Sequence, residues 1–254
     1  MTRDLAGDFD YETHGQGYAS VRRADPRIAT HVAAALDAGR SVINIGAGAG
    51  SYEPTDRYVA AVEPSKSMRS QRPATAVPAI DATAEALPFD DDTFDAALAA
   101  ITIHQWHDLD QGLCELRRVS RGPVVILTFD GDALDRLWLA EYAPELIAAE
   151  RRRYPTIDHI TSVLGGSSKV STVSIPADCT DGFTEAFYAR PERFLDPAVR
   201  ASQSAWGFVD EHAITRTVDA LRRDLTNGTW DKRHGHLREQ PSFEGSLRLL
   251  VNHP

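Results

Sequence analysis

Five short apolar runs divide the first half of the chain, and each has the length of a buried strand. They cover residues 41–45, 58–62, 77–80, 94–101 and 124–129. The runs are nearly continuous in apolar residues, as strands are when helices cover both faces of a sheet. Because helical segments lie between them, the sequence predicts an α/β fold with a parallel sheet.

Helix signals fit between and after these runs. Asp25 followed by Pro26 predicts a helix start, since aspartate caps the first N–H groups and proline fits the first turn. Pro144 is expected to split a helical stretch because proline removes an internal hydrogen bond. Further helices are expected over residues 65–72, 83–87, 108–119, 132–153 and 210–225.

The second half adds less regular sequence. Residues 170–175 and 247–251 are expected to be strands, and residues 182–189 an extended segment. We predict three parts: an N-terminal arm over 1–24, an α/β core over 25–175 plus 242–254, and an inserted cap over 176–241, where the substrate is expected to bind.

Composition excludes some classes of function. The 254 residues carry 27 lysines and arginines against 37 aspartates and glutamates, a net charge of −10. A nucleic-acid partner is therefore not expected, since its phosphates require an excess of basic residues. Cys114 and Cys179 lack disulfide or zinc spacing, and neither a signal peptide nor a membrane span is expected, so we predict a cytoplasmic protein.

A glycine loop follows the first apolar run. Gly46, Gly48 and Gly50 allow a sharp turn and let a ligand lie against the backbone. A plain tight turn is the alternative. The dinucleotide fingerprint G-x-G-x-x-G requires glycine at position 51, where this chain has Ser51.

Carboxylates follow the next two runs. Glu63 can accept hydrogen bonds from both hydroxyls of a ribose, and Asp81 with Ala82 can contact an adenine. Glu63 as a solvated strand end and Asp81 as a helix cap are the alternatives. Because parallel strands end at one edge of the sheet, the three elements together predict a nucleoside site.

These motifs resemble those of a known family. Residues 41–130 are similar to the core of class I S-adenosylmethionine-dependent methyltransferases, nearest the small-molecule group that includes trans-aconitate and ubiquinone-biosynthesis methyltransferases. The resemblance rests on residues 43–50, 62–65, 81–89 and 94–96. It implies a Rossmann-like fold with a mostly parallel seven-stranded sheet, helices on both faces and a C-terminal cap.

The resemblance also implies a cofactor, S-adenosylmethionine, and residues that hold it. The glycine loop would contact its methionine part, Glu63 its ribose and Asp81 its adenine. The expected binding residues are Tyr18, Arg23, Gly46, Ala47, Gly48, Gly50, Glu63, Pro64, Met68, Asp81, Ala82 and Ala100.

Two departures from the family stand out. Asn44 replaces the usual aspartate that positions the glycine loop. Residues 46–57, interrupted by Pro54, are too few for a full helix, so a short or irregular loop is expected there.

Further candidates surround this core. His104 and His107 are candidate general bases, or Trp106 packs as a lid with the histidines bonded to nearby loops. No metal site is predicted, because the pair has no clear third ligand. Residues Tyr11, Tyr18, Arg22 and Arg23 of the arm close over the cofactor or form a solvated surface, and the candidate pocket aromatics are Trp138, Tyr142, Tyr188, Trp206 and Phe208.

The sequence therefore predicts transfer of a methyl group from S-adenosylmethionine to an O, N or C nucleophile of a small molecule. The arginines around the predicted pocket weakly favour an acceptor that carries a carboxylate. The alternatives are an NAD(P)-dependent oxidoreductase and a non-catalytic S-adenosylmethionine-binding protein. The acceptor and the oligomeric state stay open.

Overall fold

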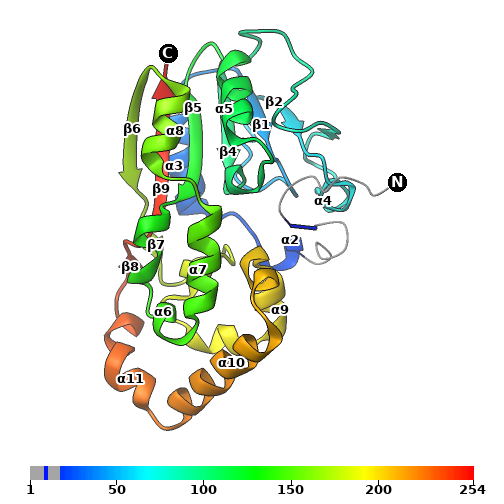
Figure 1. Cartoon of the computed structure of the whole chain (residues 1–254). Helices are drawn as coiled ribbons and strands as arrows, with labels where there is room; N and C mark the ends of the chain where they lie inside the picture. Colours follow the sequence, from blue (N-terminus) through cyan, green and yellow to red (C-terminus); the bar gives the residue numbers. More distant parts are fainter. Residues whose placement is uncertain (1–8, 11–17) are drawn as a thin grey trace.

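A mixed sheet of seven strands forms the centre of the computed structural model, which describes residues 9–10 and 18–254 (Figure 1). The strand order is β3-β2-β1-β4-β5-β9-β6, with β1 to β5 parallel and β9 antiparallel to β5 and β6. This confirms the predicted fold class. The strands are β1 (Ser41–Ile45), β2 (Tyr58–Val62), β3 (Ala79–Ile80), β4 (Ala96–Ala100), β5 (Val124–Phe129), β6 (Ser167–Thr172) and β9 (Leu247–His253).

Two apolar layers cover the faces of this sheet. On one face α3 (Pro26–Ala35) packs through Ile28 and Val32 against alternate strand residues such as Leu98. On the other face α5 (Leu109–Arg118) and α8 (Ile157–Leu164) pack against the residues in between. Because both faces are covered, almost every side chain of β1, β4 and β5 is buried, as the continuous apolar runs predicted.

Most of the remaining elements form a cap at one end of the sheet, seen as the lower half of Figure 1. Trp138 lies at its centre, with the rings of Phe194 and Trp230 edge-on at 5.8 and 5.3 Å. The cap elements are η2 (Gly131–Arg136), α6 (Leu139–Tyr142), α7 (Pro144–Arg153), η3 (Thr184–Phe187), η4 (Pro191–Leu195), α9 (Pro197–Ala201), η5 (Ser204–Phe208), α10 (Glu211–Thr226), α11 (Thr229–His234), η6 (Gly235–Arg238) and the strands β7 (Ile175–Pro176) and β8 (Ser242–Phe243).

The apolar core of the cap begins earlier than the predicted insertion over 176–241. Trp138, Leu139 and Leu146 belong to it, although they precede β6 in the chain. The predicted division into arm, core and cap itself stays a prediction, and residues 1–8 and 11–17 of the arm lie outside the described residues.

Several local predictions are confirmed. The Asp25 side chain accepts from the Arg27 N–H at the start of α3, and Asp210 caps α10. Pro144 separates α6 from α7. Residues 46–57 form turns and no helix, as their number predicted. Short elements also appear at α2 (Tyr18–Val21), α4 (Lys66–Ser70) and η1 (Ile103–Gln105).

Two local predictions are wrong, and one helix was missed. Residues 83–87 form turns, because Pro88 follows too soon for a helix and the Leu87 N–H donates to Glu115 instead. Residues 182–189 contain the 3₁₀ helix η3, which buries Phe183 and Ala186 three positions apart. Residues 157–164 form α8, which we did not predict.

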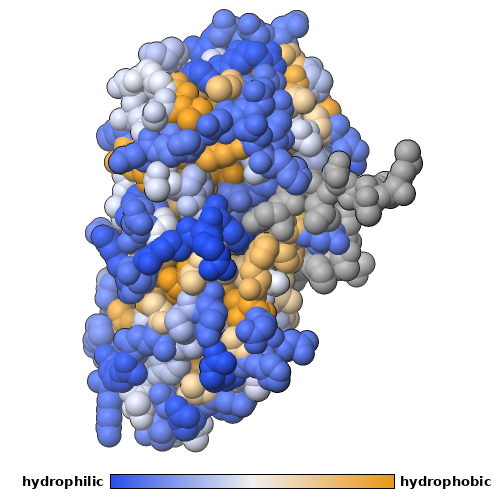
Figure 2. All heavy atoms as spheres, in the orientation of Figure 1, coloured by the Kyte–Doolittle hydropathy of each residue, from blue (hydrophilic) through white to orange (hydrophobic). Residues whose placement is uncertain are grey.

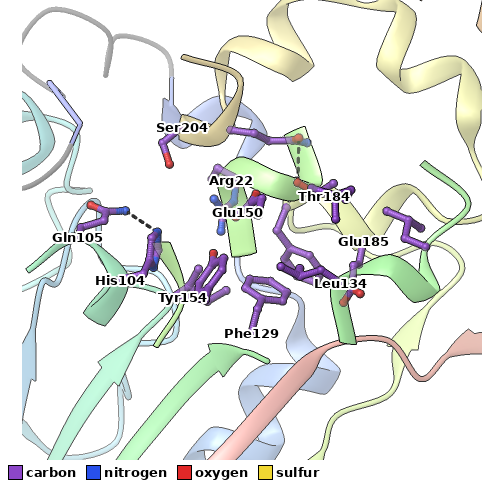
Figure 3. Close-up of a pocket in the computed structure, with 15 residues that line it drawn as sticks. Arg22, His104, Gln105, Phe129, Leu134, Glu150, Tyr154, Thr184, Glu185 and Ser204 are labelled. Carbon is purple, nitrogen blue, oxygen red and sulfur yellow. Dashed lines mark hydrogen bonds between the residues drawn. The ribbon is translucent and has the colours of Figure 1, made fainter. Parts of the chain in front are cut away.

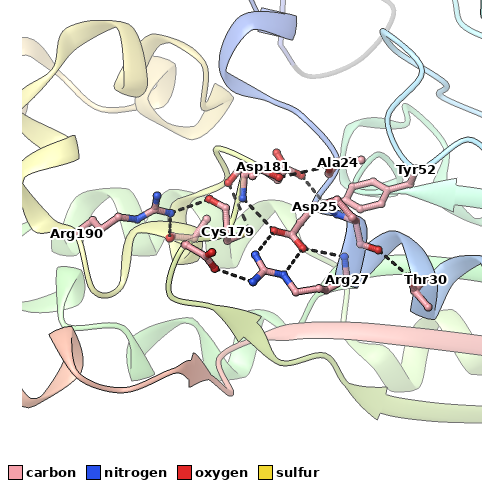
Figure 4. Close-up of polar contacts among 12 residues, drawn as sticks. Ala24, Asp25, Arg27, Thr30, Tyr52, Cys179, Asp181 and Arg190 are labelled. Atoms are coloured by element: carbon pink, nitrogen blue, oxygen red, sulfur yellow. Dashed lines mark hydrogen bonds and ion pairs between the residues drawn. The ribbon is translucent and has the colours of Figure 1, made fainter.

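A polar cluster fastens the start of α3 to the loop at 178–181 (Figure 4). The fully buried carboxylate of Asp25 accepts from the Arg27 guanidinium at 2.7 Å and from the Thr180 N–H at 3.1 Å. Arg27 also pairs with Asp178 at 2.7 Å. Hydrogen bonds from Arg27 hold the pKa of Asp25 well below its usual range. The cluster therefore ties cap to core through charges that stay ionised.

The surface is mostly hydrophilic on the face shown in Figure 2, with small separate apolar patches. Large apolar side chains that remain exposed are Tyr58, Ile80, Val170 and Phe208. Among the described helices, none combines the length and the apolar content that a membrane span needs.

Candidate active site

The first cavity lies at the carboxyl ends of β1, β2 and β4, and we call it the glycine-loop cavity. It encloses about 500 Å³, measured to its open mouth. Its lining residues are Tyr18, Asn44, Gly46, Ala47, Gly48, Ala49, Ser51, Glu63, Met68, Ala100, Ile101, Thr102 and Gln105. Ligands of open α/β sheets bind at this edge, so the cavity lies where the motifs predicted.

Sterics explain the glycines of the loop. Gly46 has a φ of +64°, and a Cβ there would lie 2.0 Å from the Oγ1 of Thr102. Gly48 has a φ of +51°, a conformation that side chains disfavour, and its N–H donates to Glu63. The loop thus exposes backbone to the cavity.

Glu63 is fixed at the end of β2 with 8% of its surface exposed. Its two carboxylate oxygens accept from the N–H groups of Gly48 and Ser65, each at 2.8 Å. Burial raises the pKa of Glu63, and these two N–H groups oppose that rise. A carboxylate has about four acceptor sites, so both oxygens can still accept from ligand hydroxyls.

A buried network holds the loop from behind. Asn44 donates to Glu53 at 3.0 Å, and Arg72 pairs with Glu53 at 2.8 Å while donating to the Gly48 carbonyl at 3.4 Å. Asn44 is thereby linked to the loop, as its position predicted. The sequence did not indicate a role for Glu53 and Arg72, because neither lies in a motif and charged residues of this kind are usually solvated.

Seven of the twelve predicted cofactor residues line the glycine-loop cavity. They are Tyr18, Gly46, Ala47, Gly48, Glu63, Met68 and Ala100. The five that do not line it are Arg23, Gly50, Pro64, Asp81 and Ala82. The lining also includes residues that we did not predict, among them Thr102 and Gln105.

Asp81 and Arg23 both lie at the surface, away from this cavity. Asp81 is largely exposed and pairs with Arg69 at 2.8 Å. Arg23 is also exposed, whereas Arg22, one position earlier, lines the second cavity described below. Tyr11 lies outside the described residues.

The second cavity lies between the sheet and the cap, and we call it the cap pocket (Figure 3). Its space, measured to the open mouth, is about 560 Å³. Its lining residues are Arg22, Ile101, His104, Gln105, Phe129, Leu134, Leu137, Ile147, Glu150, Tyr154, Phe183, Thr184, Glu185, Gln203 and Ser204.

The two cavities share part of their walls. Ile101 and Gln105 line both. Ile101 has a φ of +53°, which is an outlier for a β-branched residue. Such backbone strain gathers at ligand sites, where the surrounding structure enforces it. The two cavities are therefore adjacent at these two residues.

His104 lines the cap pocket beside Gln105, with 8% of its surface exposed. Its Nδ1 has no hydrogen-bond partner among the described residues, and the Gln105 amide nitrogen lies 3.3 Å from its Nε2. Its ring lies against that of Tyr154, with centroids 4.4 Å apart. Burial, with help from Arg153 and Arg22, lowers the pKa of His104 well below 6.5, so the imidazole is neutral at pH 7.

His107, the other predicted base, lies elsewhere. It is exposed, does not line the cap pocket, and its N–H donates to Glu85 at 2.9 Å. The structure thus separates the two histidines, and geometry favours His104.

The charges of the cap pocket differ from our expectation. Arg22 pairs with the buried Asp181 at 2.6 Å, and Asp181 also accepts from the Tyr52 hydroxyl at 2.8 Å. Glu150 and Glu185 add two buried carboxyl groups. The pocket therefore presents no excess of positive charge to a ligand.

The five aromatics expected around the substrate do not line the cap pocket. Trp138, Tyr188 and Trp206 are buried in the apolar core of the cap, and Tyr142 packs against it. Phe208 is 43% exposed. The aromatic rings that do line the pocket come from Phe129, Tyr154 and Phe183.

The described side chains were also compared with the ligand sets that metal ions need. In the parts of the chain that the structure describes, no three His, Cys, Asp or Glu side chains gather in a way that could hold a metal ion.

The fold agrees with what the resemblance implied. The sheet order, the single antiparallel strand β9 and the glycine loop after β1 match the Rossmann-like methyltransferase fold expected from the sequence. A family model described as a methyltransferase domain matches residues 43–126, which include the glycine loop, Glu63 and β4.

Several solved structures share this fold. A protein from an antibiotic biosynthesis pathway of Anabaena variabilis, provisionally assigned as a methyltransferase, is 28% identical, with a TM-score of 0.85 over 91% of this chain and 98% of its own. A Thermotoga maritima S-adenosylmethionine-dependent methyltransferase, a possible histamine N-methyltransferase, is 17% identical, with a TM-score of 0.56 over 96% and 97%. The [4+2]-cyclase SpnF is 14% identical, with a TM-score of 0.56 over 96% and 94%.

The last two likenesses show the fold alone. No curated protein sequence matches the chain. The domain match makes residues 43–126 similar to a methyltransferase domain, and the first neighbour shares the fold over 91% of the chain. The chain's resemblance to the trans-aconitate and ubiquinone-biosynthesis group stays a prediction.

Proposed function

We propose that this chain is an S-adenosylmethionine-dependent methyltransferase that acts on a small molecule bound in the cap pocket, with the cofactor in the glycine-loop cavity and His104 as the general base. One observation carries the proposal: the two cavities meet at Ile101 and Gln105. A nucleophile in one cavity can thereby reach a methyl group held in the other, and alignment of the two reactants is the main requirement of this reaction.

The residues of the glycine-loop cavity fit S-adenosylmethionine. The absence of side chains at Gly46 and Gly48 leaves room against the backbone, and Glu63 has acceptor sites for two ribose hydroxyls. When bound, the cofactor supplies a methyl group already activated on a sulfonium. Tyr18 and Met68 complete the cavity wall, and contacts from Arg23, Gly50, Pro64, Asp81 and Ala82 stay predictions.

His104 supports the proton transfer. Its neutral imidazole can accept a proton from the acceptor nucleophile as the bond to the methyl carbon forms. The lowered pKa makes it a weak base, which suits a hydroxyl, because a hydroxyl oxygen that gains a methyl group becomes strongly acidic. We therefore favour an acceptor that reacts through a protonated heteroatom.

Charge and location complete the proposal. The net charge of −10 supports a small-molecule acceptor over a nucleic acid. The sparse cysteines support a cytoplasmic location.

The test uses labelled S-adenosylmethionine with a metabolite extract. We expect a labelled small-molecule product, and we expect His104→Gln to lower its rate by about 10²- to 10⁴-fold, as for loss of a general base. Calorimetry with S-adenosylhomocysteine should give the same affinity for this variant and the wild type. His107→Gln is the matched control and should keep the rate.

Two results would overturn the proposal. Stabilisation by NAD and not by S-adenosylhomocysteine would favour the oxidoreductase alternative. Tight binding of S-adenosylhomocysteine without any labelled product would favour a non-catalytic binding protein.

A further inference from the structure

Glu185 lies across the cap pocket from His104. Figure 3 shows His104 and Gln105 at one side of the pocket and Glu185 at the other, with Tyr154 and Phe129 between them. Glu185 is carried by η3 of the cap and is 1% exposed. A ligand whose reacting atom lies beside Gln105 would reach Glu185 with its far end.

The position of the Glu185 carboxyl group is built into the backbone. Both of its oxygens accept from the Ser246 N–H, at 2.9 and 3.0 Å. A Cβ on Gly245 would lie 2.4 Å from its Oε1, so a larger residue at position 245 would displace the Glu185 carboxyl group. A carboxylate has about four acceptor sites, so the Ser246 N–H and the Ser246 hydroxyl beside it still leave acceptor capacity for a ligand.

The charged groups around Glu185 leave its ionisation finely balanced. Burial raises its pKa to about 7, the Ser246 N–H and Arg248 of β9 oppose the rise, and Glu150 of α7 adds to it. Arg248 itself is paired with Asp130 at 3.0 Å. A cation in the pocket would therefore find a carboxylate whose charge is incompletely matched.

The middle of the pocket is apolar. The rings of Phe129 and Tyr154 meet edge to face at 5.4 Å, and Leu134 lies beside them. A flat apolar segment of a ligand suits this surface, because ring edges and faces pack favourably.

We propose that Glu185 binds an ammonium group at the far end of the methyl acceptor. The acceptor class is then a molecule with a nucleophilic hydroxyl at one end, an aromatic or flat middle and a protonated amine at the other end. The inference rests on the proposed function, in that the cap pocket holds the acceptor. It replaces the expectation of an acceptor carboxylate, which two buried carboxyl groups would repel.

Three phenols that differ at one end provide the test: tyramine with an ammonium group, 4-propylphenol with a methyl group, and 3-(4-hydroxyphenyl)propionate with a carboxylate. Each is titrated into the protein with S-adenosylhomocysteine present, by calorimetry at pH 8. We expect tyramine to bind at least about tenfold more tightly than the other two, as one charge-assisted hydrogen bond provides.

Two variants separate recognition from structure. Glu185→Gln keeps an acceptor for the Ser246 N–H, and we expect it to lose the preference for tyramine. Glu192→Gln removes a half-exposed cap carboxylate paired with Arg238, and we expect it to keep the preference. A merely structural Glu185 would change all three affinities alike.

A pH series adds an independent readout. Between pH 6 and pH 8 the wild type should bind tyramine about tenfold more tightly, because the ionised fraction of a carboxyl with a pKa of about 7 rises by that factor. The affinity for 4-propylphenol should stay constant.

Equal affinity for the three phenols would overturn the inference. So would a preference for the carboxylate, an unchanged preference in Glu185→Gln, or no binding at millimolar concentration. These titrations need no turnover, so their failure is distinguishable from a failure of methyl transfer in the labelled assay.

Discussion

The glycine-loop cavity and the cap pocket are built from different kinds of contact. The first is made by loops that follow neighbouring strands, and backbone groups of Gly46 and Gly48 form much of its wall. The second is made by side chains from η1, α7, η3 and η5, which are far apart in the chain. A nucleoside site can thus be fixed by short motifs, whereas an acceptor site depends on how the cap packs.

The largest expected effect comes from a change in the backbone wall of the glycine-loop cavity. Gly46→Ala places a Cβ 2.0 Å from Thr102 Oγ1 at a φ of +64°, and we expect a loss of about 4 kcal/mol in the free energy of unfolding, with loss of S-adenosylhomocysteine binding. Chemical denaturation and calorimetry measure the two effects.

Gly228→Ala is its matched control. Gly228 lies in the left-handed region with a φ of +75° and has nothing within 4 Å of the added Cβ. We expect about 1 kcal/mol there, from backbone strain alone. Equal losses for the two variants would show that the contact with Thr102 is not what requires glycine at position 46.

The next effect tests a buried side chain of the cap pocket. We compare the free energy of unfolding of Glu185→Gln with that of the wild type. This difference should shift in favour of the variant as the pH rises from 5 to 8. A carboxyl whose pKa is raised from 4.5 to about 7 binds more protons in the folded state, so the wild type loses stability as pH rises through that window. The differential is at most about 3 kcal/mol. A pH-independent difference in denaturation midpoints would contradict it.

A third comparison lies within the nucleoside site itself. Glu63→Gln should weaken S-adenosylhomocysteine binding about 30-fold, since one charge-assisted hydrogen bond is worth about 2 kcal/mol. Asp81→Asn should weaken it less than about fivefold, because Asp81 is 70% exposed and pairs with Arg69. If calorimetry showed a larger loss of affinity for Asp81→Asn than for Glu63→Gln, Asp81 would be supported as the residue that binds adenine.

The smallest effect concerns the link between the two regions. Tyr52→Phe removes a hydroxyl that donates to the buried Asp181 at 2.8 Å, and we expect a loss of about 1.5 kcal/mol in the free energy of unfolding. Cofactor affinity should change less than about twofold. Tyr58→Phe, at a side chain 67% exposed, is the control and should be neutral. A large loss of cofactor affinity in Tyr52→Phe would show that the glycine loop depends on the cap.

The same contrast explains what the sequence could predict. The strands and the places of Gly46 and Glu63 follow from apolar runs and strand ends, which are local signals. Arg22, Tyr154 and Glu185 come together through packing of the cap, which no local spacing encodes. The aromatics chosen for the pocket, such as Trp138 and Trp206, instead fill the core of the cap, because apolar burial is the commoner use of a large ring.

The shared wall has a thermodynamic consequence. Because Ile101 and Gln105 border both cavities, a ligand that shifts them in one cavity changes the free energy of binding in the other. This coupling is reciprocal: the factor by which the cofactor changes acceptor affinity equals the factor by which the acceptor changes cofactor affinity. The strained backbone at Ile101, with its φ of +53°, is where such coupling energy can be stored. In the proposed reaction, order of addition and product inhibition would then both report on the conformation of Ile101.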